Sequence, residues 1–220
     1  DRDYPGLLDQ VREAYATPGV RGVLLEIDSP GGEVAGLFDA IEGLAAIRAE
    51  AGRPLWAVAS DLAASAAYGI ASVADRILVT RTGEVGSVGV VAMHVERSAA
   101  NAQRGLAVTL IHAGARKTDG NPHEPLPERV AAEMQRDVDD LYGEFAALVA
   151  TGRGVSPDAI LAQESAVFRG RFAVEAGLAD GVASSAEAAH TFAAALDRGD
   201  ASRGSRRRAT PSERNATMPE

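Results

Sequence analysis

The chain has 220 residues, of which 46% are hydrophobic and 24% charged, the balance of an ordinary soluble globular protein and not of a disordered or fibrous one. It contains no cysteine, so thiol catalysis, disulfides and cysteine-ligated zinc are excluded. The net charge is −9, and residues 1–196 hold 16 basic against 27 acidic residues, which argues against nucleic-acid binding as the main function. No apolar run approaches the roughly 18 residues that a membrane span needs, so we expect no membrane segment in this chain.

The apolar residues alternate between helical and strand spacing along the chain, which predicts an α/β fold. We expect helices over residues 6–16, 33–50, 62–73, 96–104, 128–150, 172–178 and 185–196. We expect strands over residues 22–28, 54–59, 76–80, 84–95 and 107–112, and a polar loop over 113–127. Ser156-Pro157-Asp158 has the form of an N-cap with proline at the first helical position, and therefore opens a further short helix. No internal repeat is visible. Residues 1–196 are expected to form one domain, followed by a disordered, arginine-containing tail or linker over 197–220.

The segment Asp28-Ser29-Pro30-Gly31-Gly32 lies between a predicted strand and a predicted helix. Paired glycines leave backbone N–H groups unobstructed at a helix N-terminus, where they can stabilise a developing oxyanion. The alternative interpretation is a plain strand-to-helix turn.

Ser65 is flanked by alanines in the segment from Asp61 to Gly69. The small neighbours leave its hydroxyl accessible to an extended substrate, and the Ala66 N–H is a candidate second oxyanion donor. The competing interpretation is a serine that only packs in an alanine-rich helix.

Lys117 is the single lysine of the chain, whereas the other 21 basic residues are arginines. Arginine is not deprotonated in proteins, but a lysine removed from water can become a neutral base. If the loop around Lys117 folds over the serine, desolvation and the adjacent Arg116 both favour the neutral amine, which can accept the Ser65 proton. The alternative interpretation is that Lys117 is an ordinary surface lysine in an arginine-rich chain. The four histidines lack metal-ligand spacing and are expected to be structural or exposed: His94, His112, His123 and His190.

The chain resembles the S49 serine peptidases, which include signal peptide peptidase A and the phage head maturation proteases. The resemblance runs from about Val20 to Val182. Its motifs are Asp28–Gly32, Ala64–Tyr68, Gly86-Ser87-Val88-Gly89-Val90, Lys117 in its loop, and Phe168–Gly181. The separations of 52 residues from Ser65 to Lys117 and 22 from Ser65 to Ser87 agree with the family pattern.

The resemblance implies a ClpP/crotonase-like fold of repeated β-β-α units with a C-terminal helical segment. It also implies a catalytic Ser65–Lys117 dyad, with Ser87 orienting the amine and Gly31 and Ala66 supplying oxyanion N–H groups. The substrate-binding residues that it implies are Gly32, Val88 and Gly89. Neither a cofactor nor a metal ion is expected.

The partners implied are a polypeptide substrate and other copies of the chain. The copies are expected to form a ring, for which an octamer is one expected size, and neighbouring subunits are expected to share active sites. Ala66-Ala67 replaces the usual Gly-Gly after the nucleophile, which puts catalytic efficiency in question. The family strand that precedes residue 6 is missing from this sequence.

The Lys117 loop and the arginine-containing tail resemble the phage head proteases more closely than the cellular ones. This favours a capsid scaffold or portal protein as partner, and host cytoplasm or procapsid as location. The alternatives are a cellular protease like signal peptide peptidase A, a crotonase-type acyl-CoA enzyme, a catalytically silent scaffold-binding module, and nucleic-acid binding through the tail.

Overall fold

A computed structural model describes residues 3–199 of the chain. The chain divides into two compact units, of which the second comprises Val90–Gly143 and the first the remainder. A single domain over residues 1–196 stays a prediction. The predicted tail beyond residue 199, including Arg206-Arg207-Arg208, lies outside the described residues, whereas Asp197 and Arg198 belong to the last helix.

The elements follow the alternating order that the sequence predicts. The helices of the first unit are α1 (Tyr4–Ala16), α2 (Leu37–Ala51), α3 (Ala66–Ser72), α6 (Pro157–Leu161), α7 (Arg171–Glu175) and α8 (Ser185–Arg198). Helix α4 (Ser98–Gln103) lies in the second unit, and α5 (Glu128–Arg153) contributes residues to both. The strands are β1 (Val23–Ser29), β2 (Leu55–Ala64), β3 (Arg76–Val79), β4 (Glu84–Gly86), β5 (Val167–Arg169) and β6 (Gly181–Val182). The N-cap at Ser156 is confirmed, because its Oγ accepts a hydrogen bond from the Ala159 N–H at 3.2 Å.

Strand β2 is the centre of a six-stranded sheet with the order β5-β4-β2-β3-β6, and β1 also pairs with β2. All pairs are parallel except β4 with β5. Strand β3 pairs with Trp56–Ala59, and β4 pairs with Leu62–Ala64 further along. Strand β1 pairs along much of β2. We therefore assign β3 and β4 to the opposite edge of β2, where β3 pairs with its first half and β4 with its end.

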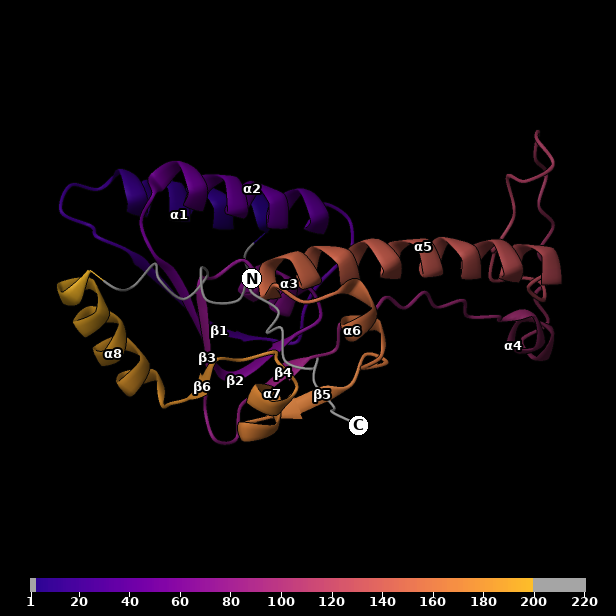
Figure 1. Cartoon of the computed structure of the whole chain (residues 1–220). Helices are drawn as coiled ribbons and strands as arrows, with labels where there is room; N and C mark the ends of the chain where they lie inside the picture. Colours follow the sequence, from indigo (N-terminus) through magenta and orange to yellow (C-terminus); the bar gives the residue numbers. More distant parts are fainter. Residues whose placement is uncertain (1–2, 200–220) are drawn as a thin grey trace, which may run out of the picture. The chain divides into compact units, whose positions relative to one another are not determined.

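The core covers both faces of this sheet. Residues 55–59 of β2 are all buried, the pattern of a parallel strand between two layers of helices. On one face Trp56 packs against Phe192 of α8, with ring centroids 5.2 Å apart. Successive side chains of a strand point to opposite faces, so Leu55 and Ala57 face the other side. Helices α1 and α2 lie together on one side of the sheet and α8 on the other (Figure 1).

Some predicted boundaries are wrong. Residues 62–64 belong to β2 and not to a helix, because they pair with β4 on one edge and Ala63 pairs with Ser29 of β1 on the other. The predicted helix at 33–50 begins only at Leu37, after the left-handed Gly36. Two short strands, β5 and β6, were not predicted, since two or three residues carry no periodicity of their own.

The strand predicted at 84–95 is wrong in part, and the strand predicted at 107–112 is wrong as a whole. Only Glu84–Gly86 forms a strand, and residues 107–112 form none. Both segments have the strand pattern of alternating apolar residues, but within residues 3–199 neither residues 87–95 nor 107–112 pair with a strand. Their apolar side chains, among them Val91, Met93 and Ile111, are exposed.

The second unit is organised by polar contacts more than by a core. Among the described residues 90–143, Val130 is the one buried hydrophobic residue. A network of ion pairs joins Arg116, Asp119, Arg129 and Glu133, and holds the 113–120 turns against the first turns of α5. No helix within residues 3–199 is both long and apolar enough to cross a membrane.

Candidate active site

Ser65 occupies the turn between the end of β2 and the start of α3. Its backbone has φ 53° and ψ −127°, a conformation that residues other than glycine rarely adopt. Its N–H donates to the Gly86 carbonyl at 2.8 Å and its carbonyl accepts from the Gly69 N–H at 3.0 Å. Ala64 and Ala66 on either side are buried, while Ser65 itself is partly exposed. The fold thus presents one hydroxyl at the carboxyl end of the central strand.

Gly31 lies directly against this turn. A Cβ built on Gly31 would lie 2.7 Å from the Ser65 Cβ, 3.0 Å from the Ala64 carbonyl oxygen and 3.2 Å from the Ala66 nitrogen. The φ of Gly31 is +117°, which also favours glycine. The structure therefore brings together the backbones of the two predicted oxyanion residues, Gly31 and Ala66, beside the Ser65 side chain. The Gly31 N–H donates to Ser29 Oγ at 3.3 Å.

The loop that carries Gly31 is held from the N-terminal helix, a contact that the sequence did not predict. Tyr4 of α1 donates its hydroxyl hydrogen to the Glu33 carbonyl at 2.6 Å. A Cβ built on Gly32 would lie 3.1 Å from the same hydroxyl. Burial, with a smaller contribution from Glu33, raises the pKa of Tyr4 above 10.0, so the phenol stays a hydrogen-bond donor at neutral pH.

Ser87 follows β4 as Ser65 follows β2. The preceding residues, Ala64 and Gly86, are partners in the parallel register, so the two serines leave adjacent strands at the same level. Ser87 has φ 52°, almost the same as Ser65, and its N–H donates to the Ala166 carbonyl at 3.0 Å. Of the other predicted binding residues, Val88 is buried and Gly89 is packed against Ser165.

Lys117 lies in the second unit, where its side chain is exposed and its N–H donates to the Gly114 carbonyl at 3.1 Å. The adjacent Arg116 forms ion pairs with Asp119 and Glu133. The pairing of Ser65 with Lys117 stays a prediction. His112 and His190 are exposed, whereas His94 and His123 are partly buried and hydrogen-bonded within the second unit, as His94 is to the Asn121 carbonyl. Residues 3–199 contain no cluster of three His, Asp or Glu side chains placed to hold a metal ion.

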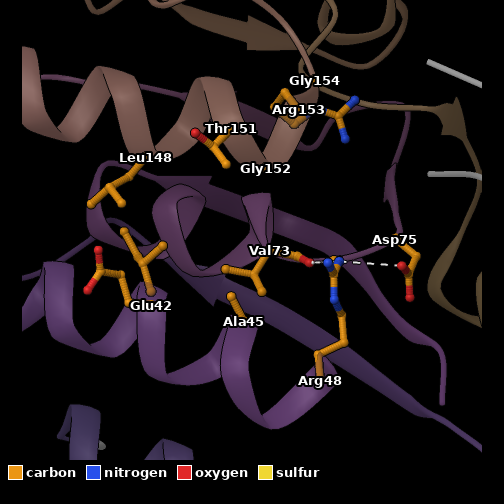
Figure 2. Close-up of a pocket in the computed structure, with 12 residues that line it drawn as sticks. Glu42, Ala45, Arg48, Val73, Asp75, Leu148, Thr151, Gly152, Arg153 and Gly154 are labelled. Atoms are coloured by element: carbon orange, nitrogen blue, oxygen red, sulfur yellow. Dashed lines mark hydrogen bonds and ion pairs between the residues drawn. The ribbon is translucent and has the colours of Figure 1, made fainter. Parts of the chain in front are cut away.

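A separate cavity of about 440 Å³ lies in the first unit between α2, the turn at 73–75 and the end of α5. None of the predicted catalytic residues lines it. Figure 2 shows Arg48 pointing across it to the Val73 carbonyl and to Asp75, with which it forms an ion pair at 3.4 Å. Arg153, at its other end, is buried and paired with Asp180 at 3.1 Å. These two ion pairs stabilise the fold, and we assign no chemistry to this cavity.

The fold and the turn at Ser65 define the class of this chain: an α/β protein that presents a serine at the carboxyl end of parallel strands, beside a glycine backbone. The model of Peptidase family S49 matches residues 47–197. The chain belongs to this family, which confirms the resemblance seen in the sequence motifs.

The relatives include phage and cellular proteins. The chain is 43% identical over 194 residues to the head-tail preconnector protein GP5 of Enterobacteria phage P21, which covers 88% of this chain and 38% of that protein. It is 40% identical over 194 residues to the capsid assembly protease C of Escherichia phage lambda, over 88% of this chain and 44% of that protein. A putative signal peptide peptidase SppA of Enterococcus faecium is 28% identical over 187 residues, 84% of this chain and 54% of that protein. The chain spans less than half the length of the two phage relatives.

A solved structure, the 1510-N membrane-bound stomatin-specific protease, matches with a TM-score of 0.55 and 14% sequence identity. The match covers 86% of this chain and 76% of that one. At this identity the match shows the fold alone, and together with the family match it confirms the predicted α/β fold class.

Proposed function

We infer that the chain is a serine endopeptidase in which Ser65 is the nucleophile and Lys117 the general base. The observation that carries this proposal is the turn at Ser65: a strained, partly exposed serine whose Cβ lies against the Gly31 backbone and next to the Ala66 N–H. Backbone strain of this kind persists where the surrounding structure enforces it, and it concentrates at active sites. Membership of Peptidase family S49 supports the same chemistry.

The reaction is acyl transfer. The neutral Lys117 amine accepts the proton of Ser65 Oγ, and the oxygen attacks the carbonyl carbon of the scissile peptide. The Gly31 and Ala66 N–H groups stabilise the oxyanion, and for this the Gly31 N–H exchanges its long bond to Ser29 Oγ for the substrate oxygen. The protonated amine gives its proton to the leaving nitrogen. Water then attacks the acyl-enzyme, with the amine taking its proton, and Ser65 regains its hydrogen.

Ser87 is proposed to orient the amine. Its support is positional, because it leaves the neighbouring strand in register with Ser65 and with nearly the same φ. Lys117 is supported by its place in a turn-rich loop and as the single lysine of the chain. Since its side chain is exposed within this chain, the dry surroundings that favour a neutral amine would be supplied by loop closure or by a second subunit.

The proposed substrate is a polypeptide in phage head maturation, with a capsid scaffold or portal protein as partner and host cytoplasm or procapsid as location. The two phage relatives, at 43% and 40% identity, support this over a cellular role like that of the 28% identical putative signal peptide peptidase. The proposed assembly is a ring of identical subunits with shared active sites, and Gly32, Val88 and Gly89 are proposed to contact the substrate.

The proposal is tested by hydrolysis of dye-labelled casein by the wild type, Ser65→Ala and Lys117→Arg. Both substitutions should lower kcat by at least about a thousandfold, since one removes the nucleophile and the other replaces the base with a guanidinium that stays protonated. Size-exclusion chromatography should show unchanged assembly. Near-wild-type activity in Ser65→Ala would refute the nucleophile, and in Lys117→Arg it would refute the base.

A further inference from the structure

The turn at residues 163–166 packs onto the segment that leaves β4. The Ser165 hydroxyl donates to the Val88 carbonyl at 2.8 Å. One residue on, the Ala166 carbonyl accepts from the Ser87 N–H at 3.0 Å, and β5 then continues antiparallel to β4. Two successive residues of the turn therefore hold two successive residues of the Ser87–Gly89 segment.

This turn is conformationally unusual. Glu164 has φ 49° and Ser165 φ 59°, so two consecutive residues with side chains adopt left-handed backbone values. The turn is closed by the Ala166 N–H, which donates to the Gln163 carbonyl at 2.9 Å. The Gln163 side chain in turn donates to the Ala176 carbonyl at 3.1 Å. The surroundings thus enforce the strained backbone that aims the Ser165 hydroxyl at Val88.

Gly89 shows how closely the two segments approach. A Cβ built on Gly89 would lie 2.1 Å from Ser165 Oγ and 2.9 Å from Ser165 Cβ. The φ of Gly89 is not left-handed, so the need for glycine here is one of space. The Ser165 side chain occupies the volume that a residue at position 89 would otherwise fill.

We propose that Ser165 is a positioning residue that fixes the backbone of Val88 and Gly89, two residues proposed to contact an extended polypeptide substrate. This rests on the proposed peptidase function and deepens it. A substrate strand bound beside this segment depends on where the backbone groups of residues 88 and 89 are held. The hydroxyl of Ser165 sets that position through the Val88 carbonyl.

The test is the kinetics of Ser165→Ala on dye-labelled casein, with a small fluorophosphonate as a second probe of Ser65. Loss of the hydroxyl frees Val88 and Gly89, and KM should rise about three- to tenfold, the effect of losing one hydrogen bond. The backbone bond from the Ser87 N–H to the Ala166 carbonyl remains, so kcat should stay within about twofold. The labelling rate of Ser65 should stay within about twofold, because a small phosphonate does not use the strand contacts. A general loss of structure would lower kcat and the labelling rate together.

Ser184→Ala is the matched control. Ser184 is also a hydrogen-bonded serine, whose Oγ accepts from the Glu187 N–H at 3.2 Å at the start of α8, outside the proposed site. Its hydroxyl also donates to Glu187 Oε2 at 2.8 Å, so Ser184→Ala loses at least as much hydrogen bonding as Ser165→Ala and should leave the KM for casein unchanged.

Gly89→Ala perturbs the same contact from the side of Gly89, and it is the second test if Ser165→Ala does not fold. Its Cβ displaces Ser165, so KM should rise as in Ser165→Ala. A wild-type KM in folded Ser165→Ala, or in Gly89→Ala, overturns the positioning role and leaves the peptidase proposal intact. A wild-type protein that neither cleaves casein nor reacts with the phosphonate overturns the proposed function, and this inference with it.

Discussion

Position 31 requires glycine for two separate reasons, the left-handed φ of +117° and the lack of space beside Ser65. Any side chain here would either push the nucleophile away or move its own N–H from the oxyanion position. The contact between Gly31 and Ser65 therefore fixes the position of the Ser65 hydroxyl and that of the Gly31 N–H, the proposed oxyanion donor.

We expect Gly31→Ala to lower kcat for casein by about 10²- to 10³-fold, the usual effect of losing one oxyanion donor. Gly19→Ala is the control, since Gly19 has φ +84° but nothing within 4 Å of the added Cβ. It introduces similar backbone strain without a clash, and should lower the thermal midpoint while kcat is kept. A Gly31→Ala protein with normal kcat would show that the Gly31 N–H takes no part.

At the scale of elements, two aspartates tie the sheet to its helices in the same way. Asp75 precedes β3, donates its N–H to the Leu55 carbonyl and accepts the Leu55 N–H on its side chain. Asp180 precedes β6 and makes the same exchange with Ile77 of the neighbouring strand. Each is paired with an arginine of a helix, Arg48 of α2 or Arg153 of α5. This recurring connection is consistent with a fold of repeated strand and helix units.

The Asp75 carboxyl should make stability depend on pH. Burial raises its pKa above 3.8, and the hydrogen bond from Leu55 and the charge of Arg48 offset only part of the shift. The folded protein then binds the proton more tightly than the unfolded chain. The contribution of this group is fully present below pH 3.8 and is lost as the pH rises through the raised pKa, by at most about 1.4 kcal/mol per pH unit.

Asp75→Asn removes this titration while keeping an acceptor for the Leu55 N–H. Urea unfolding from about pH 3.5 to 7 should show that the free energy of unfolding of the wild type, minus that of the variant, falls with rising pH and then levels off. A difference that is constant or rises over this range would contradict the assignment.

For the whole molecule, the second unit exposes a set of large apolar side chains that an isolated soluble protein seldom leaves uncovered. They are Val91, Met93, Val95, Leu106, Val108, Leu110 and Ile111. Together with the exposed Lys117, they agree with the proposal that subunits assemble and share active sites.

Sharing of active sites predicts complementation between inactive variants. When Ser65→Ala and Lys117→Arg are co-expressed in equal amounts, random assembly pairs an intact Ser65 with an intact Lys117 at about one site in four, so about a quarter of wild-type activity should return. Casein hydrolysis by the mixture measures this, and each variant alone gives the background. If mixed assemblies form and stay inactive, the dyad is not shared between subunits.

Much of the candidate site could be predicted from the sequence, because its chemistry lies in short motifs. Gly31 follows the predicted strand at 22–28, and parallel strands bring their carboxyl ends to one edge. Ser65 and Ser87 also lie in short motifs, but the sequence pattern puts them within a helix at 62–73 and a strand at 84–95, and only the structure places each directly after a strand. The alternating pattern likewise predicted the α/β class and most helices. The contacts made by Tyr4 and Ser165 carried no such signal, since each is a lone polar residue whose partner lies 29 or 77 positions away.

The amino-acid sequence by itself determined the periodic elements and the turns that only glycine or small residues permit, because these depend on neighbours along the chain. Tertiary structure alone decided that residues 62–64 extend a strand, that residues 107–112 form none, and that Ser165 supports Val88. A strand exists only where another strand supplies its hydrogen bonds, and a hydroxyl acquires a role only from the carbonyl that the fold places within its reach.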